Sequence, residues 1–315
     1  MQPTHPSLVI IAMATRNGAD WLGPQLASIA AQDHPHWALW VSDDGSTDAT
    51  RALVAGFQAQ HPGHDIRLFD GPGQGAAQNF LSLVTHPEIP PGAYVALCDQ
   101  DDVWLPAKLS RGVAQLAGNA GHDLAGAAIY GAQSLHIGAG GRVVGRSRRP
   151  VRPVCVQNAV VQNMVSGHSM LLNPAAVALA RSAGRPAGIG FHDWWLALLV
   201  LATGGRVVVD RAVVLHYRQH GANVIGAPAG LAAQWQRIRL LFGHDYAGWI
   251  AANLAGLAGL QTGKLTAEAQ AIVAGLGGGP RFGPGRVQAL RRLRIHRQTR
   301  FGTALLYLAA VLGRV

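Results

Sequence analysis

The stretch Tyr94-Val95-Ala96-Leu97-Cys98-Asp99-Gln100-Asp101-Asp102 joins an apolar run to three carboxylates. A short apolar run of this kind is typical of a strand that is buried on both faces of a parallel sheet. In open parallel sheets, active sites lie at the carboxyl ends of the strands. The stretch therefore predicts a buried strand that delivers carboxylates to a functional site.

The residues on either side of this stretch repeat the same plan. Further strands are expected at 8–13, 37–42, 66–69 and 206–209, and helices at 21–32, 46–57, 76–84 and 190–202. Alternation of strands and helices predicts an α/β fold with a mostly parallel, Rossmann-like sheet covered by helices on both faces. The segment Gly138 to Pro153 is rich in Gly, Arg and Pro and is expected to be an exposed loop.

The pattern changes after Gly226-Ala227-Pro228, which divides the chain into an α/β domain (1–226) and a helical C-terminal extension (227–315). The extension is expected to open with a long amphipathic helix. That helix is marked by Leu231, Trp235, Ile238 and Leu241. A Gly/Pro linker at 275–285 and one final helix are expected to follow.

The net charge of +10 is concentrated in the extension, because Glu268 is the last acidic residue. Arginines then precede apolar residues at helical spacing. The residues concerned are Arg291, Arg292, Arg294, Arg297, Arg300, Phe301, Leu305, Leu308 and Leu312. Such a helix over 286–312 can lie on an anionic membrane surface, or its apolar face can pack on the protein. No base-reading motif accompanies the arginines, so nucleic acid is not expected as a partner.

The two cysteines have no metal-like spacing, which fits a reduced, cytoplasmic protein. No apolar run reaches the roughly 20 residues that a membrane-spanning helix needs. We therefore expect a cytoplasmic protein that the tail could hold at the inner face of the plasma membrane.

Three polar clusters follow expected strands: Thr15-Arg16-Asn17, Asp43-Asp44-Gly45-Ser46 and Asp99-Gln100-Asp101-Asp102. Three carboxylates within four residues repel one another unless a cation is present, and Mg²⁺ or Mn²⁺ prefers such oxygen ligands. Asp99, Asp101 and Asp102 are thus candidate metal ligands, although a solvated acidic turn would look the same. Asp43 and Asp44 could bind a base or ribose, or form a turn that caps a helix.

A competing pattern, Gly71-Pro72-Gly73-Gln74-Gly75-Ala76, loosely fits the dinucleotide fingerprint G-x-G-x-x-G/A. It follows an expected strand, and Asp99 lies at a suitable distance for a ribose contact. Pro72 removes one N–H that could bind phosphate. A dinucleotide-binding enzyme and a non-catalytic polyanion-binding protein therefore remain alternatives.

The polar clusters also carry a family resemblance. The segment 9–50, with Thr15-Arg16-Asn17-Gly18 and Val41 to Asp48, resembles the opening of family 2 glycosyltransferases of the GT-A fold. The segment 98–109 is similar to the Asp-x-Asp segment of bacterial rhamnosyltransferase-like members. Segments 191–195 and 216–226 resemble later parts of the same group, so the resemblance spans about 7–226.

The resemblance implies roles for individual residues. Residues expected on the nucleotide side are Thr15, Asn17, Asp43, Asp44, Gly75, Asn79, Asp99, Arg218 and His220. Metal contacts are implied for Asp99, Asp101 and Asp102, and Asn163 and Gly167 lie in a stretch that resembles the wall beside the sugar. Arg16 stands where a tyrosine is common, which puts stacking at that position in doubt.

Asp193 is implied as the general base, which in an inverting transfer takes the proton of the acceptor hydroxyl. On the residues alone, it could equally favour the start of a helix through the helix dipole. Arg218 or His220 could stabilise the leaving diphosphate.

The implied reaction is an inverting sugar transfer that uses Mg²⁺ or Mn²⁺. The donor is a nucleotide-sugar, with dTDP-rhamnose favoured over UDP-sugars, and the acceptor is a hydroxyl of a cell-surface glycan or a lipid-linked glycan.

Overall fold

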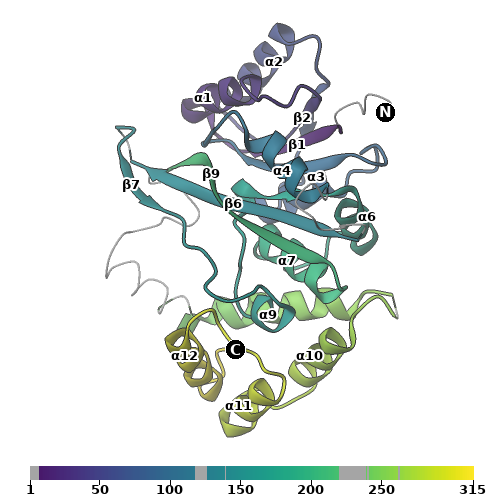
Figure 1. Cartoon of the computed structure of the whole chain (residues 1–315), viewed down its shortest axis with the longest axis vertical. Helices are drawn as coiled ribbons and strands as arrows, with labels where there is room; N and C mark the ends of the chain where they lie inside the picture. The colour runs from purple at the N-terminus through teal and green to yellow at the C-terminus, as the bar shows by residue number, and fades with distance from the viewer. Residues whose placement is uncertain (1–6, 118–125, 139, 220–238, 240, 262) are drawn as a thin grey trace.

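The structure is a computed structural model that describes residues 7–117, 126–138, 140–219, 239, 241–261 and 263–315. Figure 1 shows a sheet-containing part at one end of the molecule and the C-terminal helices at the other. Within the described residues, no helix is both long enough and apolar enough to span a bilayer.

The first half of the sheet has the predicted parallel arrangement. Its elements are β1 (Val9–Thr15), α1 (Ala19–Ala30), β2 (Trp37–Asp43), α2 (Thr50–Gln60), β3 (Ile66–Asp70), α3 (Ala76–Val84) and β4 (Tyr94–Asp99). The strands lie in the order β3-β2-β1-β4. Register pairs Thr15 with Asp43 and Ala14 with Asp99, so the predicted polar clusters share one edge of the sheet.

The second half of the sheet is mixed rather than parallel. Its strands are β5 (Val103–Trp104), β6 (Ala128–Ile137), β7 (Val143–Arg146), β8 (Leu171–Leu172) and β9 (Arg206–Arg218). Strand β8 lies antiparallel between β4 and β6, while β6 and β9 run parallel. Strand β9 is far longer than the expected 206–209, and it carries β5 antiparallel at its far end.

Strand β7 corrects the expectation of a loop over Gly138 to Pro153. It pairs antiparallel with β6, and the register places Arg146 opposite Leu135. Its valines, Val143 and Val144, stay about half exposed. A strand at a sheet edge can thus form from Gly- and Arg-rich sequence, because β6 supplies the hydrogen-bond partners.

Helices cover both faces of the sheet, as predicted. The remaining helices are α4 (Lys108–Leu116), α5 (Val156–Ala159), the 3-10 turn η1 (Gly167–Ser169), α6 (Pro174–Ala183) and α7 (His192–Ala202). One core packs Leu22, Val54 and Leu109 of α1, α2 and α4 against one face. The other core packs α3, α6 and α7 against the opposite face, and it continues into the C-terminal helices.

The C-terminal helices are α9 (His244–Ala258), α10 (Ala267–Gly277), α11 (Gly283–Arg292) and α12 (Arg300–Val311). The expected single final helix is therefore two helices, separated at Arg294, whose φ of 56° is left-handed and incompatible with a continuing helix. The expected helix from 231 and the domain boundary at 226 lie outside the described residues, apart from Leu241, which is buried.

Candidate functional site

The three strand-end clusters open into one large cleft of about 2400 Å³. Thr15, Asp44, Asp99 and Asp101 contribute to its walls, and Asp193 joins them from the first turn of α7. The parallel register explains why the first four of these residues lie together, because β1, β2 and β4 end at the same edge of the sheet. The cleft thus brings Thr15 and Asp193, which are far apart in the chain, into one site.

Asp43 lies beneath the cleft rather than in its wall. Its carboxylate accepts hydrogen bonds from the Thr15 hydroxyl (2.9 Å), the Ser46 N–H (3.0 Å) and the Ser46 hydroxyl, and Arg51 adds an ion pair at 3.3 Å. Burial raises the pKa of Asp43, but these hydrogen bonds outweigh it and hold the pKa below its usual range. Asp43 therefore fixes the shape of the β2 end as a buried anion.

Asp44 is held by the glycine loop that precedes α3. Its carboxylate accepts from the N–H of Gly73 (2.6 Å) and the N–H of Gly75 (3.0 Å). These are amides that a dinucleotide fingerprint would direct at a pyrophosphate, so the structure does not support that alternative. Gly75 has a φ of 85°, which favours glycine at this helix start.

Side-chain to backbone hydrogen bonds join the loops around the cleft. Gln100 accepts from the Arg16 N–H (2.9 Å) and donates to the Arg16 carbonyl (3.1 Å), which ties the β4 end to the β1 end. Asn17, in the left-handed region at φ 47°, accepts from the Thr47 N–H at 2.8 Å and so reaches the β2 end. Asn79 is buried and donates to the Ser42 carbonyl at 2.9 Å. Asn17 and Asn79 thus shape the nucleotide-side wall.

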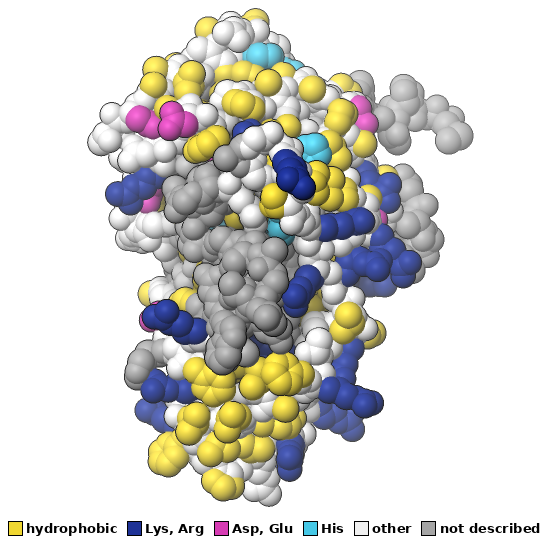
Figure 2. Space-filling view, turned by 90° about the vertical axis from the view of Figure 1, so that its left-hand side faces the viewer, with side chains coloured by type: hydrophobic (Ala, Val, Ile, Leu, Met, Phe, Trp, Pro, Cys, Tyr) yellow, Lys and Arg dark blue, Asp and Glu magenta, His cyan; other side chains and the backbone are white. Residues whose placement is uncertain are grey.

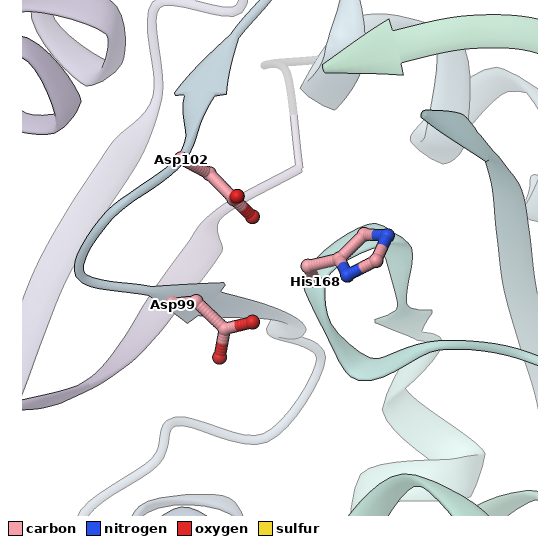
Figure 3. Close-up of side chains that lie close together, drawn as sticks. All are labelled: Asp99, Asp102 and His168. Carbon is pink, nitrogen blue, oxygen red and sulfur yellow. The ribbon is translucent and has the colours of Figure 1, made fainter. Parts of the chain in front are cut away.

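Two carboxylates and one imidazole lie close together at the cleft, where Asp99 and His168 are part of the lining (Figure 3). Potential ligand atoms of Asp99, Asp102 and His168 all lie within 4.8 Å of one another. Asp101 lies in the cleft wall and does not belong to this group. Among the described residues, neither buried oxygen of Asp102 meets hydrogen-bond geometry with a partner. The residues present therefore fit a hard divalent cation, with two oxygen ligands and one nitrogen ligand.

The pKa values of Asp99 and Asp102 are raised because several carboxylates are buried close together. Burial, followed by the charges of Asp101 and Asp193, raises the pKa of Asp99 to about 7. Burial raises the pKa of Asp102 well above its usual range, and the backbone of Arg218 offsets this only in part. Buried carboxylates with raised pKa values bind protons when no other cation neutralises them.

Lys108 supplies a cation beside the carboxylates. Its buried ammonium donates to the His168 carbonyl at 2.9 Å and lies 3.7 Å from the centre of the Trp104 ring. Burial lowers the pKa of Lys108 to about 8, while the charges of Cys98, Asp102 and Asp99 act in the opposite direction. Lys108 thereby links helix α4 to the turn that carries His168.

His168 was not predicted as a site residue. Burial, with the charges of Lys108 and His136, lowers the pKa of His168 to about 3, so its imidazole is neutral, as a metal ligand must be. The histidine belongs to the 3-10 turn η1, and only the stretch 163–173 beside the sugar wall indicated this part of the chain. Its nearness to Asp99 arises from tertiary packing and has no local sequence signal.

Asp193 occupies the first turn of α7, as the helix-start interpretation requires, and it also lies in the cleft wall. One oxygen accepts from the Gly167 N–H at 2.9 Å, and the other from the Trp194 N–H at 2.8 Å. Asn163 and Gly167 line the same wall. The carboxylate is therefore fixed in orientation toward the space near Asp99.

Arg218 contacts the carboxylate loop from β9. Its Nε donates to the Asp101 carbonyl at 3.1 Å, and its guanidinium lies 5.2 Å from the centre of the Trp21 ring. The other proposed diphosphate contact, His220, lies outside the described residues.

Comparisons with known proteins find a family that part of the chain resembles. Residues 10–138 match glycosyl transferase family 2. A dTDP-rhamnosyl transferase, RfbG of Shigella flexneri, is 26% identical over 245 residues, which cover 73% of this chain and 78% of that protein. A putative teichuronic acid biosynthesis glycosyltransferase, TuaG of Bacillus subtilis, is 31% identical over 105 residues, which cover 33% of this chain and 40% of that protein.

Solved structures share the fold. TarS of S. aureus in complex with UDP superposes with a TM-score of 0.55 at 15% identity, over 84% of this chain and 69% of TarS. A mannosyltransferase of Pyrobaculum calidifontis in complex with GDP-Man and Mn²⁺ gives a TM-score of 0.54 at 21% identity, over 99% of this chain and 88% of the other. The predicted GT-A fold is confirmed. Residues 10–138 thus resemble glycosyl transferase family 2, and most of the chain resembles a dTDP-rhamnosyl transferase.

Proposed function

We propose that the chain moves a sugar, with inversion, from a nucleotide-diphosphate donor to a hydroxyl of a cell-surface or lipid-linked glycan. One observation carries the proposal: carboxylates from the β4 end and from α7 meet in one cleft, close enough for Asp193 to raise the pKa of Asp99. The transfer needs one set of carboxylates near the donor diphosphate and another carboxylate near the attacking hydroxyl.

The nucleotide is assigned to the wall formed by the ends of β1 and β2. Thr15, Asn17, Asp44, Gly75 and Asn79 all line the cleft there. Hydroxyl, amide and carboxylate groups of this kind can bind a base and a ribose. Asp43 supports them from below through its hydrogen bond with Thr15.

A Mg²⁺ or Mn²⁺ ion would be held by Asp99, Asp102 and His168, with Asp101 beside them in the cleft wall. When bound, such an ion neutralises the charge of a departing diphosphate. The oxygens of Asp102 support this assignment, since both are buried and neither meets hydrogen-bond geometry with a described residue, while the Arg218 backbone lowers the pKa of Asp102 only in part. Asp101 remains a proposed ligand, and Arg218 would position it through the Asp101 carbonyl.

Asp193 is proposed as the general base. As the acceptor oxygen bonds to the anomeric carbon, its proton passes to the Asp193 carboxylate, and the bond from that carbon to the phosphate oxygen breaks. The hydrogen bonds from Gly167 and Trp194 hold the carboxylate for this role without occupying all its lone pairs.

The donor favoured by likeness is dTDP-rhamnose, because a relative that matches 73% of this chain is a dTDP-rhamnosyl transferase. UDP-sugars come next, since the likeness to the UDP complex of TarS concerns the fold alone.

The C-terminal helices are proposed to touch an anionic membrane. Helix α12 packs on the protein through Leu306, Ala309 and Ala310, which leaves the predicted face with Phe301, Leu308 and Leu312 more than half exposed. Figure 2 shows apolar side chains gathered at this end of the molecule, with Lys and Arg at the edges. Exposed apolar area with a basic rim fits a lipid surface.

One of the five tail arginines does not belong to this surface. Arg297 donates to the Val161 carbonyl and to the Tyr246 hydroxyl, so it anchors the tail to the protein. Arg291, Arg292, Arg294 and Arg300 are exposed. A membrane contact here would keep the chain at the inner face of the plasma membrane, near a lipid-linked acceptor.

A donor screen tests the proposed reaction. Purified protein is incubated with dTDP-rhamnose, UDP-glucose, UDP-GlcNAc or NAD, each with Mn²⁺ or with EDTA, and release of nucleotide diphosphate is measured. We expect release from one nucleotide-sugar with Mn²⁺ and none in EDTA. Equal release in EDTA would remove the metal from the mechanism, and release from no donor would refute the proposed reaction.

A further inference from the structure

The cleft has a second end, which the proposed sugar transfer does not use. It is formed by the segment 147–153 that connects β7 to α5, termed here the strap. Arg148, Arg149 and Arg152 of the strap line the cleft, and Arg211 of β9 joins them. None of these four arginines pairs with a carboxylate of the described residues.

Beneath the strap lies a separate hollow of about 490 Å³. It is lined by Gln133, Arg146, Ser147, Arg149 and Arg211. Ser147, Arg149 and Arg211 also line the main cleft, so the two spaces adjoin. Three guanidinium groups around one small hollow suit a phosphate group, while the Gln133 amide already donates to the Ser147 carbonyl.

The strap is fixed at both ends. At its start, Ser147 is bonded to β6: its N–H donates to the Ser134 carbonyl (3.0 Å), and its own carbonyl accepts from Gln133 (2.9 Å). At its other end, the buried Gln298 accepts from the N–H groups of Val151 and Arg152, at 2.8 Å each. Fixed backbone lowers the entropy that the arginines lose when a ligand binds.

A row of rings leads from the carboxylate group to the strap. The His168 ring stacks on the Tyr217 ring (5.0 Å between centroids), and the Tyr217 ring meets the edge of the His136 ring (5.4 Å). His136 pairs in register with Gly145, and the following residue, Arg146, lines the hollow. A sugar placed beside Asp193 could extend across these rings toward the arginines.

We infer that the strap arginines bind a phosphate group of the acceptor, with Arg149 and Arg211 as the specificity-determining pair. This rests on the proposed function, because it identifies the strap as the acceptor end of that cleft. Carboxylates dominate the end near Asp99 and Asp193, where an acceptor's phosphate would be repelled unless a cation intervened. The phosphate can be the diphosphate of a lipid-linked glycan or a phosphodiester of a polymer.

Direct binding tests the inference. Isothermal titration at low salt measures geranyl diphosphate, a glycerol phosphate oligomer and inorganic phosphate against wild type, the double variant Arg149→Gln/Arg211→Gln, and Arg142→Gln. Arg142 is an exposed arginine on the turn between β6 and β7 that lines neither space, so it controls for the loss of a nearby arginine outside the proposed site. EDTA is present throughout, so that no divalent cation can hold a diphosphate at Asp99.

We expect wild type and Arg142→Gln to bind the same probe, and the double variant to bind it at least about tenfold more weakly. Tighter binding of geranyl diphosphate assigns a lipid-linked acceptor, and tighter binding of the oligomer assigns a phosphodiester. Equal affinity in all three proteins, or no binding by wild type, overturns the inference.

Nucleotide binding with Mn²⁺ is measured on the same three proteins. It should be unchanged, because the variants leave the strand-end residues intact. Loss of nucleotide binding in wild type would count against the proposed function, while the strap result would still decide the phosphate site. Unaltered circular dichroism of the double variant confirms that its fold is retained, as expected for exposed side chains.

Discussion

The two ends of the cleft carry opposite charges and are built in different ways. At the donor end, the carboxylates of Asp99 and Asp102 come from a strand end and a following turn that are enclosed by the sheet and its helices, and their pKa values rise because they are buried together. At the strap, arginines project from an edge strand and a connecting segment that stay largely exposed. Like charges are concentrated at both ends, but only one end also excludes water.

This difference indicates what each end requires. A buried carboxylate group has a high free-energy cost until a cation arrives, so its occupancy should depend strongly on a metal. Exposed arginines are well hydrated and cost little when empty, so their effect should be graded and sensitive to salt. Substitutions at the donor end should therefore have larger effects than substitutions at the basic surfaces.

The largest effect is expected for Asp193→Asn, which keeps the size of the side chain but cannot accept the acceptor's proton. A positioned base contributes about 10²–10⁴ in rate, so turnover should fall by that order while donor affinity is nearly unchanged. Steady-state kinetics and nucleotide titration measure the two quantities. Asp20→Asn, in the first turn of α1, is the matched control for a helix-start role. Near-wild-type turnover with reduced stability would return Asp193 to that role.

The next effect concerns His168→Ala. Loss of one ligand from the Asp99, Asp102 and His168 group should weaken Mn²⁺ binding by about 10–100-fold, an effect seen even for residues that only support ligands. Electron paramagnetic resonance of free Mn²⁺ gives the affinity. His136→Ala removes a cleft histidine outside the group and should leave Mn²⁺ affinity unchanged. Equal affinities in both variants would exclude His168 as a ligand.

A smaller, pH-dependent effect is expected for Asp43→Asn. Hydrogen bonds to a charged group contribute about 1.5–3 kcal/mol, so the variant should be less stable by that order at pH 7. Since the folded pKa of Asp43 is lowered, this contribution is present above the unfolded pKa of about 3.9 and is lost as pH falls through the folded pKa. Denaturant unfolding of both proteins at pH 7 and below pH 4 should show the difference shrinking. A constant difference would assign it to packing.

The smallest effect is expected for Arg292→Gln on the C-terminal surface. An arginine near an anionic membrane contributes about 1 kcal/mol, so affinity for phosphatidylserine vesicles should fall roughly fivefold at low salt. Co-sedimentation measures this, and Arg185→Gln, an exposed arginine beyond helix α6, should bind like wild type. If wild type ignores the vesicles at low salt, the surface has another role.

The strand-end residues could be predicted from the sequence, because apolar runs followed by polar clusters have one structural consequence in a parallel sheet. The register of β1 with β2 and β4 then places Thr15, Asp43 and Asp99 at one edge. His168 could not be predicted, since a three-residue turn is placed by its packing against α4 and β4.

The fixed structure of the strap and of strand β7 could not be predicted from the sequence for a related reason. Their Gly, Arg and Pro composition indicates a loop, and only pairing with β6 and the contact with Gln298 give it a fixed shape. Of the four residues predicted for the apolar face of α12, Phe301, Leu308 and Leu312 are exposed, whereas Leu305 packs against the core. The face that packs on the protein proved to be the neighbouring one, with Leu306 and Ala309.

The central claim is that the buried carboxylates need a divalent cation to bind the donor's diphosphate. Titration of dTDP and UDP into wild type, with Mn²⁺ or with EDTA at pH 8, tests it most directly, because the pKa of Asp99 is about 7 and Asp99 is then mostly ionised. We predict binding at least about tenfold tighter with Mn²⁺ for one of the two nucleotides. Equal affinity with and without Mn²⁺ for both nucleotides would contradict the account.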